Sequence, residues 1–352
     1  MPPVRHPQRH RRCHWHRRPL ARALRRAAWA VAPAAVACAR TPAPPPVTRV
    51  LAHEGFLAGA GGTRLFYRVM GSAPDTVVVV HGGPGAGLNA VRPDLQPLAR
   101  THTVVFYDQR GAGRSELPAD TTRLDARAHV EDLDAVRRHF GLASMRVVAH
   151  GFGAVLVARY AESHPERLER VVFLDAVAPV RAGPDGADAL ADAAAARADS
   201  ATRQRLTDAE RALRDGAAED PVATCRAYEA VRREMAVARG DAPRWRGSRC
   251  DMPPRAVAYQ FRHAAPALLA SLGDWDFTTS LARLRTPLLL VHDADDADAL
   301  ASQRAWAAAL PDARRLPVPR AGAGAAAARP ELVLPAIEAF LAGRWPAGTV
   351  VP

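Results

Sequence analysis

The chain has 352 residues, of which 48% are hydrophobic, and a formal net charge of +12. This length suits one large domain with an insertion or two ordinary domains, and it is ample to bury a core. Residues 1–53 contain eleven arginines and no acidic residue, so they carry +11 of the charge and leave the remainder near neutral. The folded part therefore lacks the basic character of a nucleic-acid-binding protein, and we expect no nucleic-acid partner.

Residues 1–38 have the pattern of an export signal. An arginine-rich start is followed by the apolar stretch 27–37, which is too short to span a bilayer and ends with small residues at Ala35 and Ala37. Because Cys38 comes next, the segment also resembles a bacterial lipoprotein signal, although Ala35 stands where leucine is usual. We expect a bacterial protein that is exported to the periplasm or attached to the membrane through a lipid on Cys38. A transit peptide and a wrongly assigned start are the alternatives.

Residues 39–53 include a proline-rich stretch at 41–46 and predict a stiff linker between the signal and the folded part. Beyond this linker only two cysteines remain, Cys225 and Cys250. If the protein is exported, they are candidates for a disulfide, and two unpaired thiols are the alternative. The cysteines do not have the spacing of metal ligands, so we expect no metal site built from them.

From Glu54 onward, strand-like and helix-like segments alternate as in a mostly parallel sheet with helices on both faces, which is an α/β fold. Helices are predicted at 128–140, 153–160, 306–310 and 331–341. The block 179–274 has helical runs in place of strands, and we interpret it as a helical cap between two core segments, 54–178 and 275–352. The predicted strands are 63–69, 76–80, 102–107, 145–149, 171–175, 287–292 and 315–318.

A sharp turn at residues 149–153 connects a β-branched strand directly to a helix. This arrangement is typical of the nucleophile elbow of the α/β-hydrolase fold, where G-x-S-x-G presents a strained serine above the sheet. Gly151 occupies the central position in this chain. The elbow therefore predicts the fold but lacks the nucleophile.

Two further loops make the resemblance more specific. They are His81-Gly-Gly-Pro-Gly85 and Asp108-Gln-Arg-Gly-Ala-Gly-Arg-Ser115, and together with the elbow they resemble the proline iminopeptidase-like branch of the α/β-hydrolases. The resemblance implies an oxyanion hole formed by the backbone N–H groups of Gly83 and Phe152. It also implies that Asp108 and Arg110 hold loops together and do not touch substrate. A purely structural turn is the alternative for the first loop.

The resemblance implies a catalytic acid and a catalytic histidine after the elbow, in that chain order. The acid falls on Asp296, in the fourth position of the turn after the strand 287–292, and a solvated acidic loop is the alternative. The family pattern places the histidine seven residues before a proline, and seven residues before Pro330 stands Ala323. His292 is the last histidine of the chain, so none follows the acid.

A glycine cannot attack a carbonyl group, and Ala323 cannot accept a proton. We therefore expect a non-catalytic binding protein that holds a small molecule or a short peptide in a capped pocket, with no cofactor. The alternatives are an active aminopeptidase or esterase that uses an activated water, and a decaying gene product. The predicted pocket residues are His81, Gly82, His150 and His292, of which the histidines are candidate bases or, less simply, metal ligands; packed structural histidines are the plainer interpretation.

The family's cap binds the free amine of a peptide substrate through carboxylates. Glu229 and Glu234 lie in the predicted cap and are the candidates for this role, with a solvated helix face as the alternative.

Overall fold

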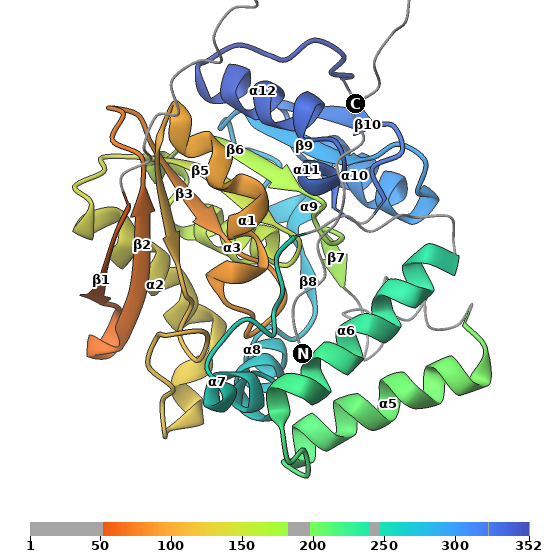
Figure 1. Ribbon diagram of the computed structural model, residues 1–352. Coiled ribbons are helices and arrows are strands. Elements are labelled where there is room, and N and C mark those ends of the chain that lie inside the picture. The colour runs from red at the N-terminus through yellow and green to blue at the C-terminus, as the bar shows by residue number, and fades with distance from the viewer. Residues whose placement is uncertain (1–51, 182–197, 239–245, 323, 352) are drawn as a thin grey trace, which may run out of the picture. The chain divides into compact units, whose positions relative to one another are not determined.

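The computed structural model describes residues 52–181, 198–238, 246–322 and 324–351. An eight-stranded sheet has the order β1-β2-β4-β3-β5-β6-β9-β10 (Figure 1). β1 pairs with β2 and β2 with β4 in antiparallel fashion, and the other neighbours are parallel, which confirms the predicted α/β fold. The strands are β1 (Ala52–Ala58), β2 (Arg64–Met70), β3 (Thr76–Val80), β4 (Thr103–Tyr107), β5 (Met145–His150), β6 (Leu168–Leu174), β9 (Leu288–Asp293) and β10 (Ala313–Val318).

Helices cover both faces of the sheet because the central strands are apolar on both sides. In β3, Val78 and Val80 join one hydrophobic cluster, and Val77 and Val79 join the other. The first cluster includes side chains of α2 (Ala126–His139), α3 (Gly153–Ser163) and α10 (Ala297–Ala309). The second includes side chains of α1 (Arg92–Leu95), α11 (Ala325–Ala328) and α12 (Pro330–Leu341). Continuous valine runs thus specify a sheet buried between two helical layers.

The strand β1 was not predicted from the sequence, which assigned the linker to residues 39–53. β1 begins at Ala52 and is an edge strand whose side chains are mostly exposed, with only Leu57 buried. Exposed edge strands carry little hydrophobic alternation, so the sequence signal is weak. The predicted signal 1–38 and the linker up to residue 51 lie outside the described residues.

A helical insertion follows β6 and corresponds to the predicted cap block. Its described helices are α5 (Ser200–Asp215), α6 (Pro221–Ala238), α7 (Pro254–Tyr259), a π-helical turn η6 (Gln260–Ala264) and α8 (Ala265–Leu272). α5 and α6 pack against each other, and α7 and η6 continue toward the sheet (Figure 1). A two-stranded antiparallel pair, β7 (Val180–Arg181) with β8 (Trp275–Asp276), joins the two ends of this insertion.

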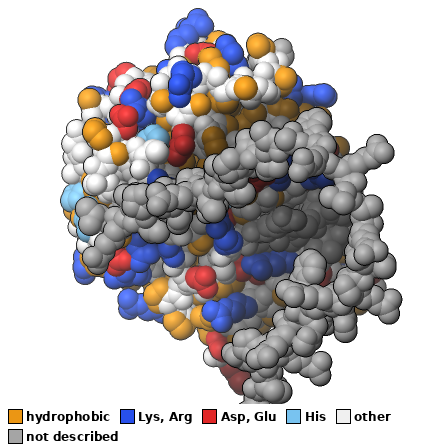
Figure 2. Space-filling view, turned by 45° about the horizontal axis from the view of Figure 1, so that its top comes forward, with side chains coloured by type: hydrophobic (Ala, Val, Ile, Leu, Met, Phe, Trp, Pro, Cys, Tyr) orange, Lys and Arg blue, Asp and Glu red, His pale blue; other side chains and the backbone are white. Residues whose placement is uncertain are grey.

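Two short helical turns are η2 (Leu88–Ala90), before α1, and α9 (Phe277–Ser280), after β8. Among the described helices, none is both long and apolar enough to cross a membrane. On the face drawn in Figure 2, positive, negative and hydrophobic side chains are interspersed wherever grey atoms do not cover the surface.

Candidate functional site at the elbow after β5

The elbow is formed as the sequence predicted, with β5 ending at His150 and α3 beginning at Gly153. Gly151 has φ +55°, a left-handed conformation that glycine adopts freely and other residues adopt with strain. Its N–H donates to the Leu174 carbonyl of β6 at 2.9 Å. A Cβ placed on Gly151 would meet a single neighbouring atom, the carbonyl oxygen of Asp175, at 4.0 Å. The elbow therefore has room for a side chain at position 151, but glycine supplies none.

The loop after β3 touches the elbow through backbone atoms. A Cβ on Gly82 would overlap the carbonyl oxygen of His150 and lie 3.1 Å from the Phe152 nitrogen. A Cβ on Gly153 would lie 2.5 Å from the Val80 carbonyl oxygen. Only glycine permits such close approach, so these two glycines are explained by packing of backbone on backbone. Gly83 follows in this loop with φ +60°, and its part in an oxyanion hole with Phe152 stays a prediction.

His81 is held in a structural role. Its ring Nδ1 donates to the Gly82 carbonyl at 3.2 Å, and its Nε2 accepts from the Gln109 N–H at 3.2 Å. Both ring nitrogens are thus used, which fixes the neutral tautomer. Burial lowers the pKa of His81 to about 4, so the ring is uncharged at neutral pH and is a weak base.

The other two predicted pocket histidines are also neutral. Burial lowers the pKa of His150 to about 4 and lowers that of His292. The His292 Nδ1 donates to the Asp293 carbonyl at 2.7 Å, while its buried Nε2 has no hydrogen-bond partner among the described residues. The described residues contain no group of His, Cys, Asp and Glu side chains arranged to hold a metal ion.

The predicted acid follows β9 in the sequence, and the predicted histidine position follows β10. Asp296 caps α10, with its Oδ1 accepting from the Ala299 N–H at 3.0 Å. This contact is the ordinary task of an acidic residue at a helix start. Ala323 lies outside the described residues, between Gly322 with φ +56° and Gly324 with φ +138°. A triad role for Asp296 stays a prediction.

Two aspartates that were not predicted as site residues lie at the carboxyl ends of the neighbouring strands β6 and β9. Asp175 directly follows β6 with φ +50°, and its Oδ2 accepts from the Ala325 N–H at 3.0 Å. Burial raises the pKa of Asp175 to about 7, the Ala325 N–H lowers it, and nearby Asp293 raises it. Asp293 ends β9 and is buried, with its Oδ1 accepting from the Asp295 N–H at 3.0 Å. An aspartate at the carboxyl end of a buried parallel strand was the signal that could have identified both.

The loop after β4, residues 108–115, supports the site without entering it. Asp108 accepts from the backbone N–H groups of Leu88 at 2.6 Å and Arg114 at 2.8 Å. Arg110 pairs with Asp132 of α2 through two hydrogen bonds of 2.6 and 2.7 Å, and both side chains are at most 2% exposed. Burial raises the pKa of Asp108 to about 6 and also raises that of Asp132, although Arg110 opposes the second shift. These contacts match the loop-holding role predicted for Asp108 and Arg110.

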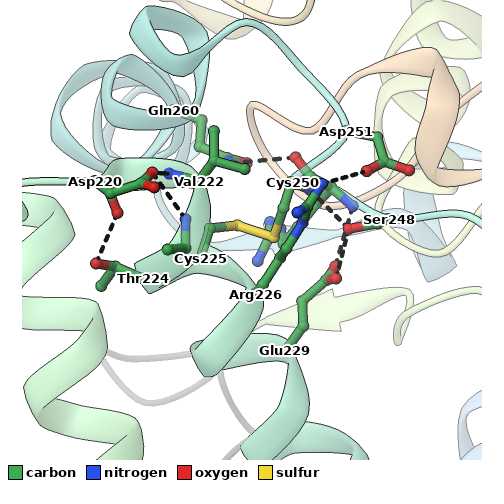
Figure 3. Close-up of a disulfide and its surroundings, with 12 residues drawn as sticks. Asp220, Val222, Thr224, Cys225, Arg226, Glu229, Ser248, Cys250, Asp251 and Gln260 are labelled. Atoms are coloured by element: carbon green, nitrogen blue, oxygen red, sulfur yellow. Dashed lines mark hydrogen bonds and ion pairs between the residues drawn. A yellow bond between two sulfur atoms is a disulfide. The ribbon is translucent and has the colours of Figure 1, made fainter. Parts of the chain in front are cut away.

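Cys225 of α6 and Cys250 form a disulfide in the structure, with an S–S distance of 2.09 Å (Figure 3). Both cysteines are buried with Leu213 and Val257 in a small hydrophobic cluster of the insertion. The disulfide therefore connects α6 to the segment that leads into α7.

The two cap carboxylates proposed as amine ligands are used by other partners. Glu229 accepts from the Ser248 hydroxyl at 2.6 Å and from the Arg249 backbone N–H at 3.0 Å, so it holds the disulfide segment in place (Figure 3). Glu234 pairs with Arg205 of α5 on the exposed surface. Both carboxylates thus have protein partners, and their amine-binding role stays a prediction.

A cavity of about 260 Å³ lies between the insertion and the core. Its walls include Asp108 and Arg114 from the support loop and Cys250 and Met252 from the insertion. None of the predicted pocket residues lines it, so this cavity is separate from the elbow.

The sequence matches the α/β-hydrolase fold family over residues 75–323, which is more than half of the chain. The chain belongs to the α/β-hydrolase family. The match begins just before β3 and includes both glycine-rich loops, the elbow and the insertion, so the resemblance stated from these motifs is confirmed at the family level.

Within this α/β-hydrolase, one segment is similar to proline iminopeptidases. The enzyme of Heyndrickxia coagulans is 34% identical over 121 residues, which cover 34% of this chain and 42% of the relative. The chain thus matches about two fifths of that relative's length. The chain is proline iminopeptidase-like in this segment.

Two solved structures illustrate the shared fold. A thermophilic esterase from Thermogutta terrifontis has a TM-score of 0.58 at 20% identity and covers 82% of this chain and 98% of its own. A proline iminopeptidase from Mycobacterium smegmatis has a TM-score of 0.54 at 21% identity and covers 82% of this chain and 95% of its own. At these identities the likeness shows the fold alone.

Proposed function

We propose that this α/β-hydrolase-fold protein binds a small molecule or a short peptide at the elbow without hydrolysing it. The observation that carries the proposal is Gly151, which stands at the nucleophile position with open space where the side chain would be. A triad without its nucleophile leaves at most the residual effect of binding and an oxyanion hole. Hydrolysis also needs a general base. No histidine follows His292, and the low pKa of His81 and His150 makes both weak bases, which supports the proposal.

A fluorophosphonate probe and a panel of prolyl amides and aryl esters test this proposal. We expect no covalent labelling and no turnover above the buffer rate with the full chain. Labelling of the folded protein, or turnover that scales with its concentration, contradicts it. Catalytically active proline iminopeptidase assayed in parallel shows that the substrates and the probe are sound.

The double variant Gly151→Ser with Ala323→His provides a matched gain-of-function experiment. If the missing groups alone account for inactivity, this variant is expected to label with the probe and to hydrolyse aryl esters slowly, while each single variant stays inactive. A folded double variant that remains inactive would place the defect elsewhere, for example in the acid assigned to Asp296. Circular dichroism and urea unfolding establish that the variants are folded.

One observation favours a second function, hydrolysis by an activated water. The backbone carbonyl oxygen of Asp175 lies 4.0 Å from the position of a Cβ on Gly151, and its side chain is a carboxyl group with a pKa of about 7, which is suited to accept a proton from water near neutral pH. Under this alternative, any turnover rises with pH around 7 and is lost in Asp175→Asn. Turnover that survives Asp175→Asn would exclude this route.

We also propose that the chain is exported through residues 1–38 and is held at the membrane by a lipid on Cys38. The arginine-rich start, the apolar stretch and the cysteine that follows it support this proposal. Expression of the full chain in a bacterial host with labelled palmitate is expected to label the membrane fraction, and Cys38→Ala is expected to remove the label. A protein that keeps its N-terminus and stays in the cytoplasm contradicts the proposal.

A further inference from the structure

Arg249 of the insertion lies beside the loop that touches the elbow. A Cβ placed on Gly83 would lie 2.9 Å from the Arg249 Nη2, with no other atom within 3.4 Å. The preceding residue, Gly82, lies against the backbone of His150 and Phe152. The guanidinium group is therefore held next to the loop that borders the open position at Gly151.

The backbone around Arg249 is fixed, which places its side chain. Its N–H donates to Glu229 at 3.0 Å, and the next residue, Cys250, is tied to α6 by the disulfide. The Arg249 Cζ lies 5.4 Å from the centre of the Phe261 ring. The guanidinium position thus follows from the disulfide, the Glu229 contact and an aromatic neighbour.

This guanidinium has no acidic partner among the described residues. No carboxylate of the described chain lies within ion-pair distance of it, and it donates no hydrogen bond to a described residue, although the side chain is half-buried. Nearby arginines differ in this respect, because Arg226 pairs with Asp251 and Arg246 pairs with Asp94. Burial lowers the pKa of Arg249, and this effect outweighs the more distant carboxylates of Glu229 and Glu210, which raise it.

An unpaired guanidinium in this position has a specific chemical preference. A charge removed from water is stabilised when an opposite charge completes its hydrogen bonds. The planar guanidinium matches the two oxygens of a carboxylate and forms paired, charge-assisted hydrogen bonds with it. Among the described residues, Glu229 and Glu234 already have partners, whereas the Arg249 guanidinium has no acidic partner, and this favours an acid over an amine as its ligand.

We propose that Arg249 binds the carboxylate of a small organic acid whose other end lies over Gly151. The inference deepens the proposed function and rests on it in one respect, that the ligand of this protein is seated at the elbow. It names the class of ligand and the residue that recognises it.

The test compares acids with their uncharged amides. Acetate, benzoate and phenylacetate are each titrated into the full chain against acetamide, benzamide and phenylacetamide, with binding followed by calorimetry and saturation-transfer NMR. We expect at least one acid to bind about tenfold or more tightly than its amide, the range expected for hydrogen bonds to a charged group. Arg249→Met is expected to remove this preference, and the control Arg226→Met, on the same insertion, is expected to keep it. If no acid exceeds its amide, or if Arg249→Met keeps the preference, the proposal is wrong.

A stability measurement separates ligand binding from a structural role. Because Arg249 lacks an acidic partner among the described residues, Arg249→Met in acid-free buffer is expected to unfold at the same urea concentration as the wild type or at a higher one. A large drop in the midpoint would identify Arg249 as a structural partner and overturn the proposal. Added acid is expected to raise the midpoint of the wild type and to leave that of Arg249→Met unchanged.

Failure of this inference and failure of the proposed function give different results. Turnover of esters together with Arg249-dependent acid binding would overturn the non-catalytic proposal and keep the acid-binding one. If there is no turnover and acids bind no more tightly than their amides, the non-catalytic proposal is kept and the acid-binding one is overturned.

Discussion

The support loop, residues 108–115 after β4, and the elbow after β5 lie at strand ends of the same sheet, with β3 between these two strands. The support loop carries buried polar side chains, and the elbow carries glycine at its centre. In the support loop, Asp108 and Arg110 are buried and each makes at least two hydrogen bonds. At the elbow, Gly151 has no side chain, and the histidine position is Ala323. The groups that hold backbone segments together are present, whereas the family's serine and histidine positions carry no reactive side chain. Under the proposed function, fold stability and chemistry depend on different residues, so the second can be lost without the first.

The strongest test of this comparison is Arg110→Met. The change leaves Asp132 as a buried carboxylate without its cation, and removal of one partner of a buried ion pair typically costs about 3–5 kcal/mol. We expect a loss of that size in the free energy of unfolding, measured in urea. The control Arg127→Met removes an exposed ion pair with Glu131 on α2, the helix that also carries Asp132. It is expected to change the free energy of unfolding by less than about 0.5 kcal/mol. Equal effects of the two variants would mean that the support loop does not hold the fold.

The disulfide tests whether the same support extends into the insertion, since Cys250 and Met252 share a cavity wall with Asp108. Replacing Cys225 and Cys250 by alanine removes a cross-link between residues 25 apart in sequence and is expected to cost about 3 kcal/mol. Urea unfolding with and without reductant measures the loss. The double variant is its own control, because reductant should no longer shift its midpoint. An unchanged midpoint in the reduced wild type would contradict a stabilising cross-link.

The fold was predictable because its signals are local. Runs such as 76–80 predict buried strands, and Gly82 and Gly153 belong to the two motifs that predicted the loop and the elbow. The structure adds that both glycines stand where backbone packs on backbone. Gly151 was likewise visible at the position where the family's elbow motif has a serine. These inferences needed only the spacing of residues along one strand, one turn and one helix.

The electrostatics of the site were not predictable in the same way. Asp175 was seen as the end of a strand, but its raised pKa depends on burial and on Asp293, which is more than a hundred residues away. Glu229 was a candidate amine ligand with a solvated helix face as the alternative, and the sequence did not indicate that it accepts hydrogen bonds from Ser248 and the Arg249 backbone. The positive charge beside Gly83 comes from Arg249, through a contact between the insertion and the core that no local pattern encodes.

Asp175→Asn tests how the buried carboxyl group after β6 affects stability as pH changes. The wild-type carboxyl keeps its proton up to a pH of about 7 in the folded state, whereas in the unfolded chain it ionises near its ordinary value of 3.8. The unfolded state therefore binds fewer protons between these values, and the contribution of Asp175 to stability falls as pH rises from about 4 to about 7. Asparagine does not ionise, so the variant is expected to gain on the wild type across this window and to be more stable at pH 8.

We expect this gain to reach about 1–3 kcal/mol at pH 8, less than the full shift implies because the side chain is partly exposed. Thermal unfolding between pH 4 and 8 measures it, with Asp208→Asn on the exposed surface of α5 as a control that should give nearly parallel curves to the wild type. A gain that is equal at pH 4 and pH 8 would show that burial of the charge is not its cause.

The smallest expected effect concerns Gly151 itself. Gly151→Ala adds a Cβ to a residue with φ +55° but meets only one atom, at 4.0 Å, so the cost is the conformational strain of about 1 kcal/mol. Gly82→Ala makes the same chemical change one loop away, where the Cβ would overlap a backbone carbonyl, and its cost is expected to be clearly larger. Urea unfolding of the two variants measures both. If Gly151→Ala lowers the free energy of unfolding as much as Gly82→Ala, the space at position 151 is already occupied. No ligand could then bind above it. A loss of about 1 kcal/mol would instead give the strain that a serine at this elbow would bear, and glycine would then make this part of the fold more stable than serine.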